Sequence, residues 1–128
     1  MRYLIDTHAL LWWWLDDARL PRPVRDELGD RGNDIHVSTV SGWEIATKVR
    51  LGRLPQMAQR VHDYGLLVTE DGFRHLAVRE NHGVKAGLLS SRHRDPFDRM
   101  LAAQALIEEM AVITRDPAFT AFGCEVIW

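Results

Sequence analysis

YLIDTH, residues 3–8, is a short apolar run that ends at an acid and then turns polar. Its first three residues fit a buried strand. Thr7–Leu15 then fits a helix. Its apolar residues Leu11, Trp14 and Leu15 recur at the three- and four-residue spacing of one helix face. A strand followed at once by a helix is the repeating unit of a parallel sheet covered by helices, so this stretch predicts an α/β fold.

The same alternation of strands and helices continues along the rest of the chain. Further strands are expected at Ile35–Val40, Leu76–Val78, Ala111–Thr114 and Val126–Trp128. Helices are expected at Pro23–Arg31, Ser41–Leu51, Pro55–Asp71, Glu80–Leu89 and Pro96–Met110, with a helical turn at Pro117–Phe122. This order predicts a central, mostly parallel sheet with helices on both faces.

The composition is that of an ordinary globular protein. The chain has 128 residues, which is enough for one domain spanning residues 1–128 but too few for two. Cys124 is the single cysteine, so no disulfide can form within the chain and a reducing compartment is expected. No apolar run reaches the roughly 18 residues of a membrane span, and the charges of Arg2 and Asp6 do not fit a signal peptide. We therefore expect a cytoplasmic protein that does not enter membranes.

Acidic residues occur at four separate places beside the predicted elements. Asp6 ends the first strand, Glu44 lies in the helix after the second strand, and Asp116 follows the strand near the carboxyl end. Asp98 opens the longest helix. In a parallel sheet such positions converge at the carboxyl edge of the strands. Carboxylates gathered there resist ionisation without a cation, and Mg²⁺ or Mn²⁺ prefers oxygen ligands, so the pattern predicts a metal-dependent phosphodiesterase.

Helix capping is the alternative explanation for each of these acids. Asp6 can cap the first helix, and Ser41-Gly-Trp-Glu44 matches a capping box. Asp95 and Asp116 each precede a proline, as N-cap residues often do. Asp98 can complement the helix dipole. Capping explains each acid singly, but it does not explain why all of them belong to one edge of the sheet.

Four longer segments contain these motifs: Tyr3–Trp12, Val37–Lys48 followed by LGRL, His93–Ala105, and Ile113–Asp116. In this order they resemble the PIN-domain family and, within it, the VapC-type toxins of bacterial toxin–antitoxin pairs. The resemblance covers essentially the whole chain, although residues 56–89 match in pattern only.

The resemblance implies a ribonuclease H-like α/β/α sandwich that cleaves RNA with Mg²⁺ or Mn²⁺. It places the catalytic and metal-binding site on four acids, namely Asp6, Glu44, Asp98 and Asp116. Asp95 belongs to the same DPFD motif and is expected to act as an N-cap or to support the site.

The resemblance also implies protein partners. A small antitoxin is expected to block the acidic site, and operator DNA is expected to be reached only through that antitoxin. A homodimer is expected as well, with Trp12, Trp13 and the third helix as candidate contact surfaces. Three successive helical residues span most of the helix circumference, so at least one of the tryptophans 12–14 should lie at the surface.

Polar residues around the acids are further candidates. Thr7, Ser38 and Thr114 can form hydrogen bonds near the site or act as caps. The net charge of −2 gives no general attraction for nucleic acid, so a local basic rim is expected. Candidates for contact with RNA phosphates are Arg94, Arg99, Arg115, Lys48 and His93. A zinc site is not expected, because no cysteine pair or ligand spacing supports His8, His82 and His93.

Two other classes of function stay open. The first is a related metal enzyme, either a phosphatase or a structure-specific DNA nuclease. A haloacid-dehalogenase phosphatase would need Asp-x-Asp after the first strand, whereas Asp6 is followed by Thr7 and His8. The second is a non-catalytic module in which the acids are caps and the arginines bind nucleic acid or protein.

Overall fold

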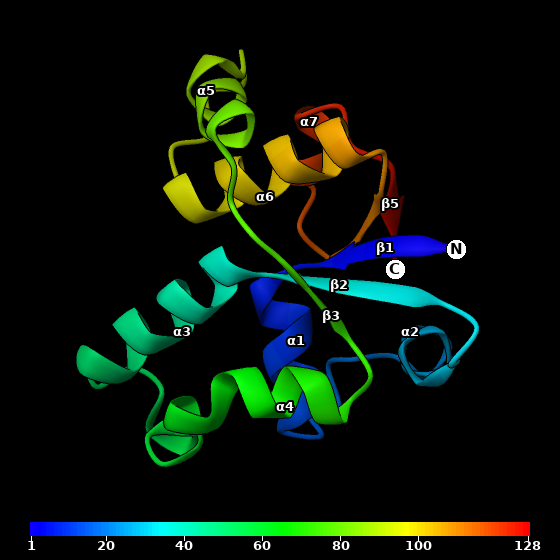
Figure 1. Ribbon diagram of the computed structural model, residues 1–128, viewed down its shortest axis with the longest axis vertical. Coiled ribbons are helices and arrows are strands. Elements are labelled where there is room, and N and C mark those ends of the chain that lie inside the picture. Colours follow the sequence, from blue (N-terminus) through cyan, green and yellow to red (C-terminus); the bar gives the residue numbers. More distant parts are fainter.

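A five-stranded parallel sheet forms the centre of the protein (Figure 1). The computed structural model describes residues 1–128. The strand order is β3-β2-β1-β4-β5, and every neighbouring pair is parallel. The sheet expected from the sequence is thereby confirmed. The strands are β1 (Arg2–Ile5), β2 (Asp34–Ser38), β3 (Arg74–Leu76), β4 (Ala111–Ile113) and β5 (Val126–Ile127).

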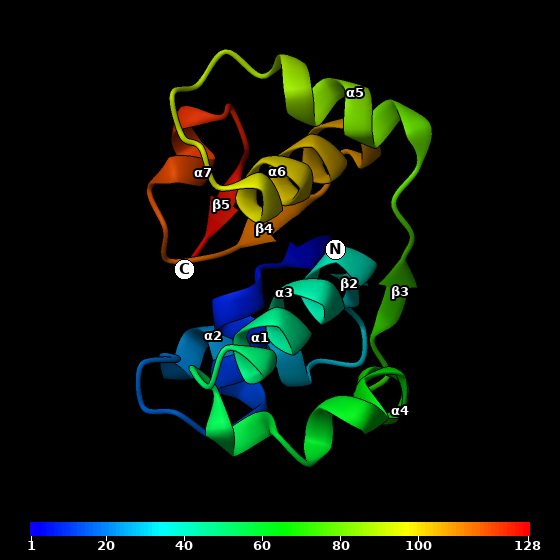
Figure 2. The same ribbon diagram turned by 90° about the vertical axis from the view of Figure 1, so that its left-hand side faces the viewer.

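Helices cover both faces of this sheet. α5, α6 and α7 lie on one side of the strands, and α1, α2, α3 and α4 lie on the other (Figure 1 and Figure 2). None of the helices is both long enough and apolar enough to cross a membrane. The α-helices are α1 (Thr7–Trp14), α2 (Arg22–Gly29), α3 (Thr39–Arg50), α4 (Tyr64–Glu70), α5 (Glu80–Leu88), α6 (Pro96–Glu108) and α7 (Ala118–Ala121), with two 3₁₀ turns, η1 (Pro55–Met57) and η2 (Arg60–Asp63).

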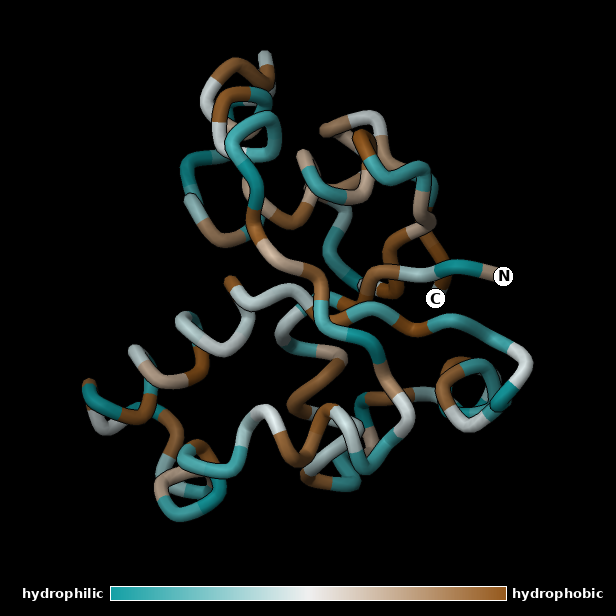
Figure 3. Tube along the Cα trace, viewed as in Figure 1, coloured by the Kyte–Doolittle hydropathy of each residue, from teal (hydrophilic) through white to brown (hydrophobic).

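Two hydrophobic cores lie on opposite faces of the sheet. Successive side chains of a strand point to opposite faces, so β1 sends Tyr3 and Ile5 into the larger core and Leu4 into the smaller. β4 divides in the same way between Ile113 and Val112. Apolar and polar residues alternate around the outer helices (Figure 3). Because both faces are covered, the central strands are continuous apolar runs rather than alternating ones.

The segment from Pro55 to Asp71 differs from the prediction of one helix. It forms η1, η2 and then α4, with changes of direction between them. Met57 and Val68 are both fully buried in the larger core. Their spacing is equally compatible with one continuous helix and with successive short helical turns. The periodicity therefore predicted correctly that this segment is helical. It predicted wrongly that the segment is one continuous helix.

The beginning of α3 also differs from the prediction, and the difference concerns the site. The helix starts at Thr39 rather than Ser41, because Ser38 is the N-cap and its hydroxyl accepts the Val40 amide at 3.1 Å. Glu44 is therefore not the third residue of the helix, and the expected capping box is absent. The carboxylate of Glu44 is free to face the edge of the sheet.

β3 lies two residues before its predicted position of Leu76–Val78. Its ladder with β2 pairs His36 with Arg74 and Ser38 with Leu76. β2 ends at Ser38 because α3 begins there, so β3 has no partner beyond Leu76. The partner strand, rather than local β-propensity, determines where β3 ends.

Candidate active site

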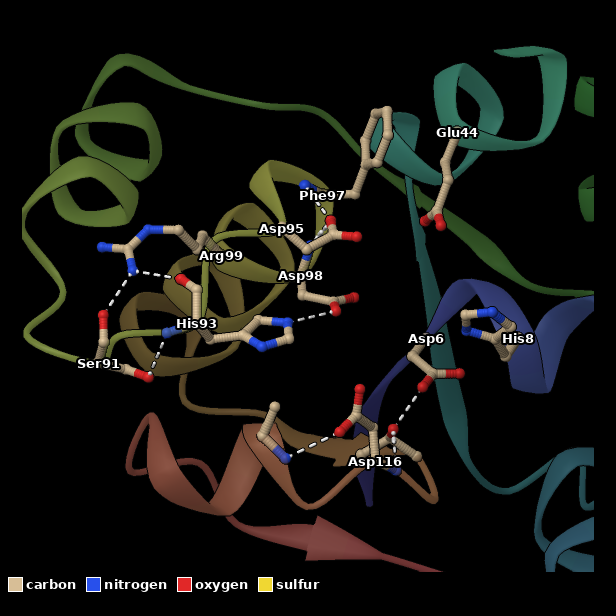
Figure 4. Close-up of polar contacts among 12 residues, drawn as sticks. Asp6, His8, Glu44, Ser91, His93, Asp95, Phe97, Asp98, Arg99 and Asp116 are labelled. Carbon is tan, nitrogen blue, oxygen red and sulfur yellow. Dashed lines mark hydrogen bonds and ion pairs between the residues drawn. The ribbon is translucent and has the colours of Figure 1, made fainter. Parts of the chain in front are cut away.

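The carboxyl edge of the sheet brings together acids from four separate parts of the chain. Asp6 directly follows β1, and Asp116 lies in the loop after β4. Glu44 comes from α3, and Asp98 from the first turn of α6. Their side chains border one common space (Figure 4). The convergence predicted from the sequence is therefore present.

Asp6 is the most constrained of these acids, with 4% of its surface exposed. One oxygen accepts the Ala9 amide at 2.7 Å, so Asp6 does cap α1. The other oxygen accepts the hydroxyl of Thr114, which in turn accepts the amide of Asp116 at 3.0 Å. Burial raises the pKa of Asp6 to about 6, the hydrogen bonds oppose this rise, and the nearby charges of Glu44 and Asp116 add to it.

Glu44 carries the most informative atom of the site. It is 3% exposed, and its Oε2 pairs with Lys48 Nζ at 3.0 Å. Its Oε1 is buried and has no hydrogen-bond partner. Buried polar atoms almost always have a partner, so an unpaired carboxylate oxygen calls for a ligand. Thr7, directly after Asp6, donates to Ser41 at 3.0 Å and so joins α1 to α3.

Asp98 and Asp95 have different roles although they share one motif. Asp95 accepts the amides of Phe97 and Asp98 at 2.8 and 3.1 Å, so it is the N-cap of α6. Asp98 Oδ2 instead lies 2.8 Å from His93 Nε2. Burial raises the pKa of Asp98 to about 6; the His93 contact lowers it, and the charges of Asp95, Glu44 and Asp116 raise it further.

The donor set fits a hard divalent cation. His93, Asp98 and Asp116 each present a ligand atom within 4.8 Å of one another. The unpaired oxygen of Glu44 and the buried Asp6 border the same space. Carboxylate oxygens dominate this set, as Mg²⁺ and Mn²⁺ prefer.

Of the five basic residues expected to bind phosphate, two are exposed and three make polar contacts within the protein. Arg115 is exposed, and its guanidinium lies 4.6 Å from the centre of the Trp12 ring, within a cleft of about 260 Å³ that also contains Asp6 and Asp116. Arg94 is exposed to solvent. Lys48 is already paired with Glu44.

Arg99 is a correction to the expected phosphate rim. Its guanidinium has five N–H groups and donates five hydrogen bonds to backbone carbonyls, at 2.6 to 3.4 Å. No N–H group is therefore left for a phosphate. The acceptors are Ala86, Gly87, Leu89, Ser91 and His93.

The expectation for the three consecutive tryptophans is also corrected. Trp12 is buried at 7% exposure. Trp13 and Trp14 are half-buried, and both indoles donate to Asp71, at 3.2 and 2.8 Å. The most exposed tryptophan is instead Trp43 on α3, at 62% exposure. None of residues 12–14 is exposed, so the expectation that at least one of them lies at the surface is wrong. Trp13 and Trp14 are half-covered instead, because Tyr64, Asp71 and Phe73 lie against them.

Two features of the site were missed at the level of sequence. The contact of His93 with Asp98 was not expected, because a histidine five residues before an acid has no helical register with it. The segment between α5 and α6 folds back to make this contact. The exposed Trp43, which packs edge-on against Phe97 at 4.8 Å, was also missed. Its position directly before the predicted site residue Glu44 could have indicated that it lies near the site.

The sequence profile of the PIN domain matches residues 3–123. This chain belongs to the PIN-domain family. PIN domains typically use a divalent metal ion, and in this one His93, Asp98 and Asp116 form a group of side chains that could hold such an ion. No curated protein sequence is significantly similar to the chain.

Solved structures share the fold of this PIN domain over nearly its whole length. VapBC2 from Rickettsia felis, bound to a DNA fragment from their promoter, has a TM-score of 0.72 at 15% identity and covers 99% of this chain and 98% of that chain. VapBC-1 from nontypeable Haemophilus influenzae has a TM-score of 0.70 at 17% identity, with 99% and 97% covered. FitAB bound to an IR36 DNA fragment has a TM-score of 0.69 at 20% identity, with 98% and 93% covered.

Proposed function

We propose that this PIN domain is a Mg²⁺- or Mn²⁺-dependent endoribonuclease and acts as the toxin of a toxin–antitoxin pair. The observation that carries the proposal is the buried, unpaired Oε1 of Glu44 facing three further acids. A set of carboxylates that only capped helices would not leave a buried oxygen without a partner. The four acids therefore fit a bound cation better than they fit capping alone.

The residues of the site divide the work of phosphodiester hydrolysis. Asp6, Asp98, Asp116 and Glu44 would hold the ion. When bound, the ion would polarise the scissile phosphate and lower the pKa of a water molecule. The chain itself keeps Asp6 and Glu44 out of bulk water, which strengthens their attraction for a cation. Arg115 and Arg94, both exposed beside the acids, would bind the phosphates of the RNA.

The proposed partners follow from the structural neighbours. These neighbours are toxin–antitoxin complexes, and two of them are bound to DNA. We infer a small antitoxin that covers the acidic site of this chain and links it to operator DNA. A homodimer belongs to the same proposal, and its contact surface now centres on α3 through Trp43 rather than on Trp12 and Trp13.

Cleavage of RNA by the purified protein tests the proposed activity. Wild-type protein should cut single-stranded RNA in Mn²⁺ or Mg²⁺ and stop in EDTA. Asp6→Asn and Asp98→Asn should each lower the rate at least about 100-fold, because each removes a charge from the cation site while keeping its shape. Asp26→Asn, which changes an exposed acid of α2, is the matched control and should cleave like wild type.

Two results would count against the proposal. Full RNA cleavage by both site variants would remove the acids from the mechanism. Cleavage of DNA or of small phosphate esters in preference to RNA would instead favour the related nuclease or phosphatase. Growth arrest on expression, relieved by Asp6→Asn, would support the toxin assignment.

A further inference from the structure

The carboxylate of Asp98 is held by a residue outside the acidic set. His93 Nε2 lies 2.8 Å from Asp98 Oδ2 and makes no other contact at that nitrogen. An ionised carboxylate only accepts hydrogen bonds, so His93 must carry its proton on Nε2 to make this contact. The contact uses Oδ2 and leaves Oδ1 of Asp98 directed toward the other acids (Figure 4).

The ring of His93 is itself fixed in place. It packs edge-on against Phe122, with the ring centres 5.6 Å apart and an angle of 81° between the planes. Its backbone amide donates to the hydroxyl of Ser91 at 3.2 Å, and its carbonyl accepts Arg99 Nη1 at 2.9 Å. Backbone and ring are therefore both constrained, although the segment belongs to no helix or strand.

Arg99 connects this support to the acid. It follows Asp98 directly on α6 and donates to five carbonyls of residues 86–93. Its guanidinium also lies 5.9 Å from the centre of the Phe122 ring. The same turn of α6 thus carries both Asp98 and the residue that anchors the histidine holding it. Because Arg99 holds the backbone of His93, the contact between His93 and Asp98 restricts the side-chain rotation of Asp98 more than a contact with a mobile histidine would.

We propose that His93 is a positioning residue of the cation site, which donates from Nε2 to Asp98 Oδ2 and presents Oδ1 to the ion. The proposal rests on the proposed metal-dependent function. Carboxylates that bind metals are commonly oriented by hydrogen bonds of this kind, and loss of such a partner typically weakens metal binding about 10- to 100-fold. A direct ligand role is disfavoured, because Mg²⁺ and Mn²⁺ prefer oxygen to imidazole nitrogen.

Binding of Mn²⁺, measured by calorimetry on the full chain without RNA, tests this proposal. His93→Phe keeps a ring against Phe122 but cannot donate, so its dissociation constant for Mn²⁺ should rise about 10- to 100-fold. His93→Gln keeps a donor and should stay within about 5-fold of wild type. His62→Phe changes an exposed histidine and is the matched control. Thermal unfolding without metal shows that each variant is folded.

A second measurement separates positioning from direct ligation. If His93 only positions Asp98, His93→Phe should weaken Mn²⁺ and Ni²⁺ by similar factors. A direct nitrogen ligand would make the loss much larger for Ni²⁺, which favours imidazole, and that result would overturn the proposal. Wild-type affinity for Mn²⁺ in a folded His93→Phe variant would overturn it as well. If His93→Phe does not fold, His93→Asn replaces it, because its shorter side chain cannot reach Asp98 with the same geometry.

The outcomes also separate this inference from the proposed function. Saturable Mn²⁺ binding that depends on His93, without any RNA cleavage, would support the positioning role and contradict the nuclease. RNA cleavage and Mn²⁺ binding that both ignore His93 would support the nuclease and overturn the positioning role. Absence of Mn²⁺ binding in wild type would overturn both.

Discussion

Asp6 is buried next to two other acids, and this has a cost for folding at neutral pH. Its pKa is about 6 in the folded protein, compared with the ordinary value of 3.8. A carboxyl whose pKa is raised by folding adds stability below the unfolded pKa, and that stability is lost as the pH rises through the folded pKa. Without divalent cations, the free energy of unfolding should therefore fall between about pH 4 and pH 6. Asp98 should contribute in the same direction, because its pKa is also about 6.

Asp6→Asn should remove part of this pH dependence. The change from 3.8 to about 6 corresponds to at most about 3 kcal/mol. Some of this is lost with the altered hydrogen bond to Thr114, so we expect metal-free Asp6→Asn to be about 1–2 kcal/mol more stable than wild type at pH 7. The two proteins should become similar near pH 4. Urea unfolding at both pH values in EDTA provides the measurement. Equal stability of Asp6→Asn and wild type at pH 7 would contradict the conclusion that the buried charge of Asp6 destabilises the folded protein.

The residues of the site were predictable to different degrees. Asp6, Asp98 and Asp116 follow or open elements that the apolar pattern located well, so their common edge could be inferred from the chain. The role of Arg99 could not, because its partners are backbone carbonyls, which have no sequence signature. The contact of His93 with Asp98 was missed for the same reason, since it depends on the path of an irregular segment.

At the scale of the elements, α3 and the first residue of α4 come unusually close. A Cβ placed on Gly42 would lie 2.9 Å from the ring of Tyr64, whose hydroxyl donates to the Ser38 carbonyl at 3.1 Å. This hydrogen bond joins the start of α3 to α4. The glycine is therefore needed for the approach of the two helices and not for a special backbone conformation.

Gly42→Ala should destabilise the protein in spite of the better helix propensity of alanine. Alanine gains about 1 kcal/mol in a helix interior, but overpacking against the Tyr64 ring costs about 1–3 kcal/mol. We expect a net loss of up to about 2 kcal/mol in urea unfolding. Gly83→Ala in α5 is the matched control, because nothing lies within 4 Å of its Cβ position, and it should be stabilising by up to about 1 kcal/mol. Stabilisation by both substitutions would show that the ring moves aside freely.

Most elements could be predicted, and the misplaced ones share a cause. β1, α1, α6 and β4 have strong apolar patterns and are bounded by residues that interrupt regular structure, such as Asp6 after β1 and Pro96 at the start of α6. β3 and residues 55–71 were misplaced because their limits depend on partners. β3 ends where β2 ends, and the 3₁₀ turns bend so that Met57 enters the larger core. Local sequence does not carry this information.

At the scale of the whole molecule, the proposed cation site lies where the two sides of the protein meet. Asp6 and Glu44 come from α1 and α3 on one side, and Asp98 comes from α6 on the other. A cation bound to all of them would link the helices that cover the two cores. Binding of the ion should therefore stabilise the fold as a whole rather than one loop.

Mn²⁺ should raise the melting temperature, and the effect should depend on pH. At about 100 times the dissociation constant, a ligand adds about 2.7 kcal/mol, which corresponds to about 8–15 °C for a domain of this size. The increase should be smaller at pH 5 than at pH 7, because protons compete for Asp6 and Asp98 below their pKa of about 6. Differential scanning fluorimetry at constant ionic strength measures it, and Asp98→Asn is the control that should show little increase. An equal increase at both pH values would argue for an ion bound elsewhere.

The hydrogen bond between Asp6 and Thr114 joins residues 108 positions apart in the chain. Contacts of such long sequence separation are slow to form, because closing the long intervening loop costs entropy before the contact adds any stability. Partly folded molecules therefore contain the acids but not their arrangement, and should be unable to cut RNA. During refolding, the proposed hydrolytic activity would emerge together with the last native contacts and not ahead of them.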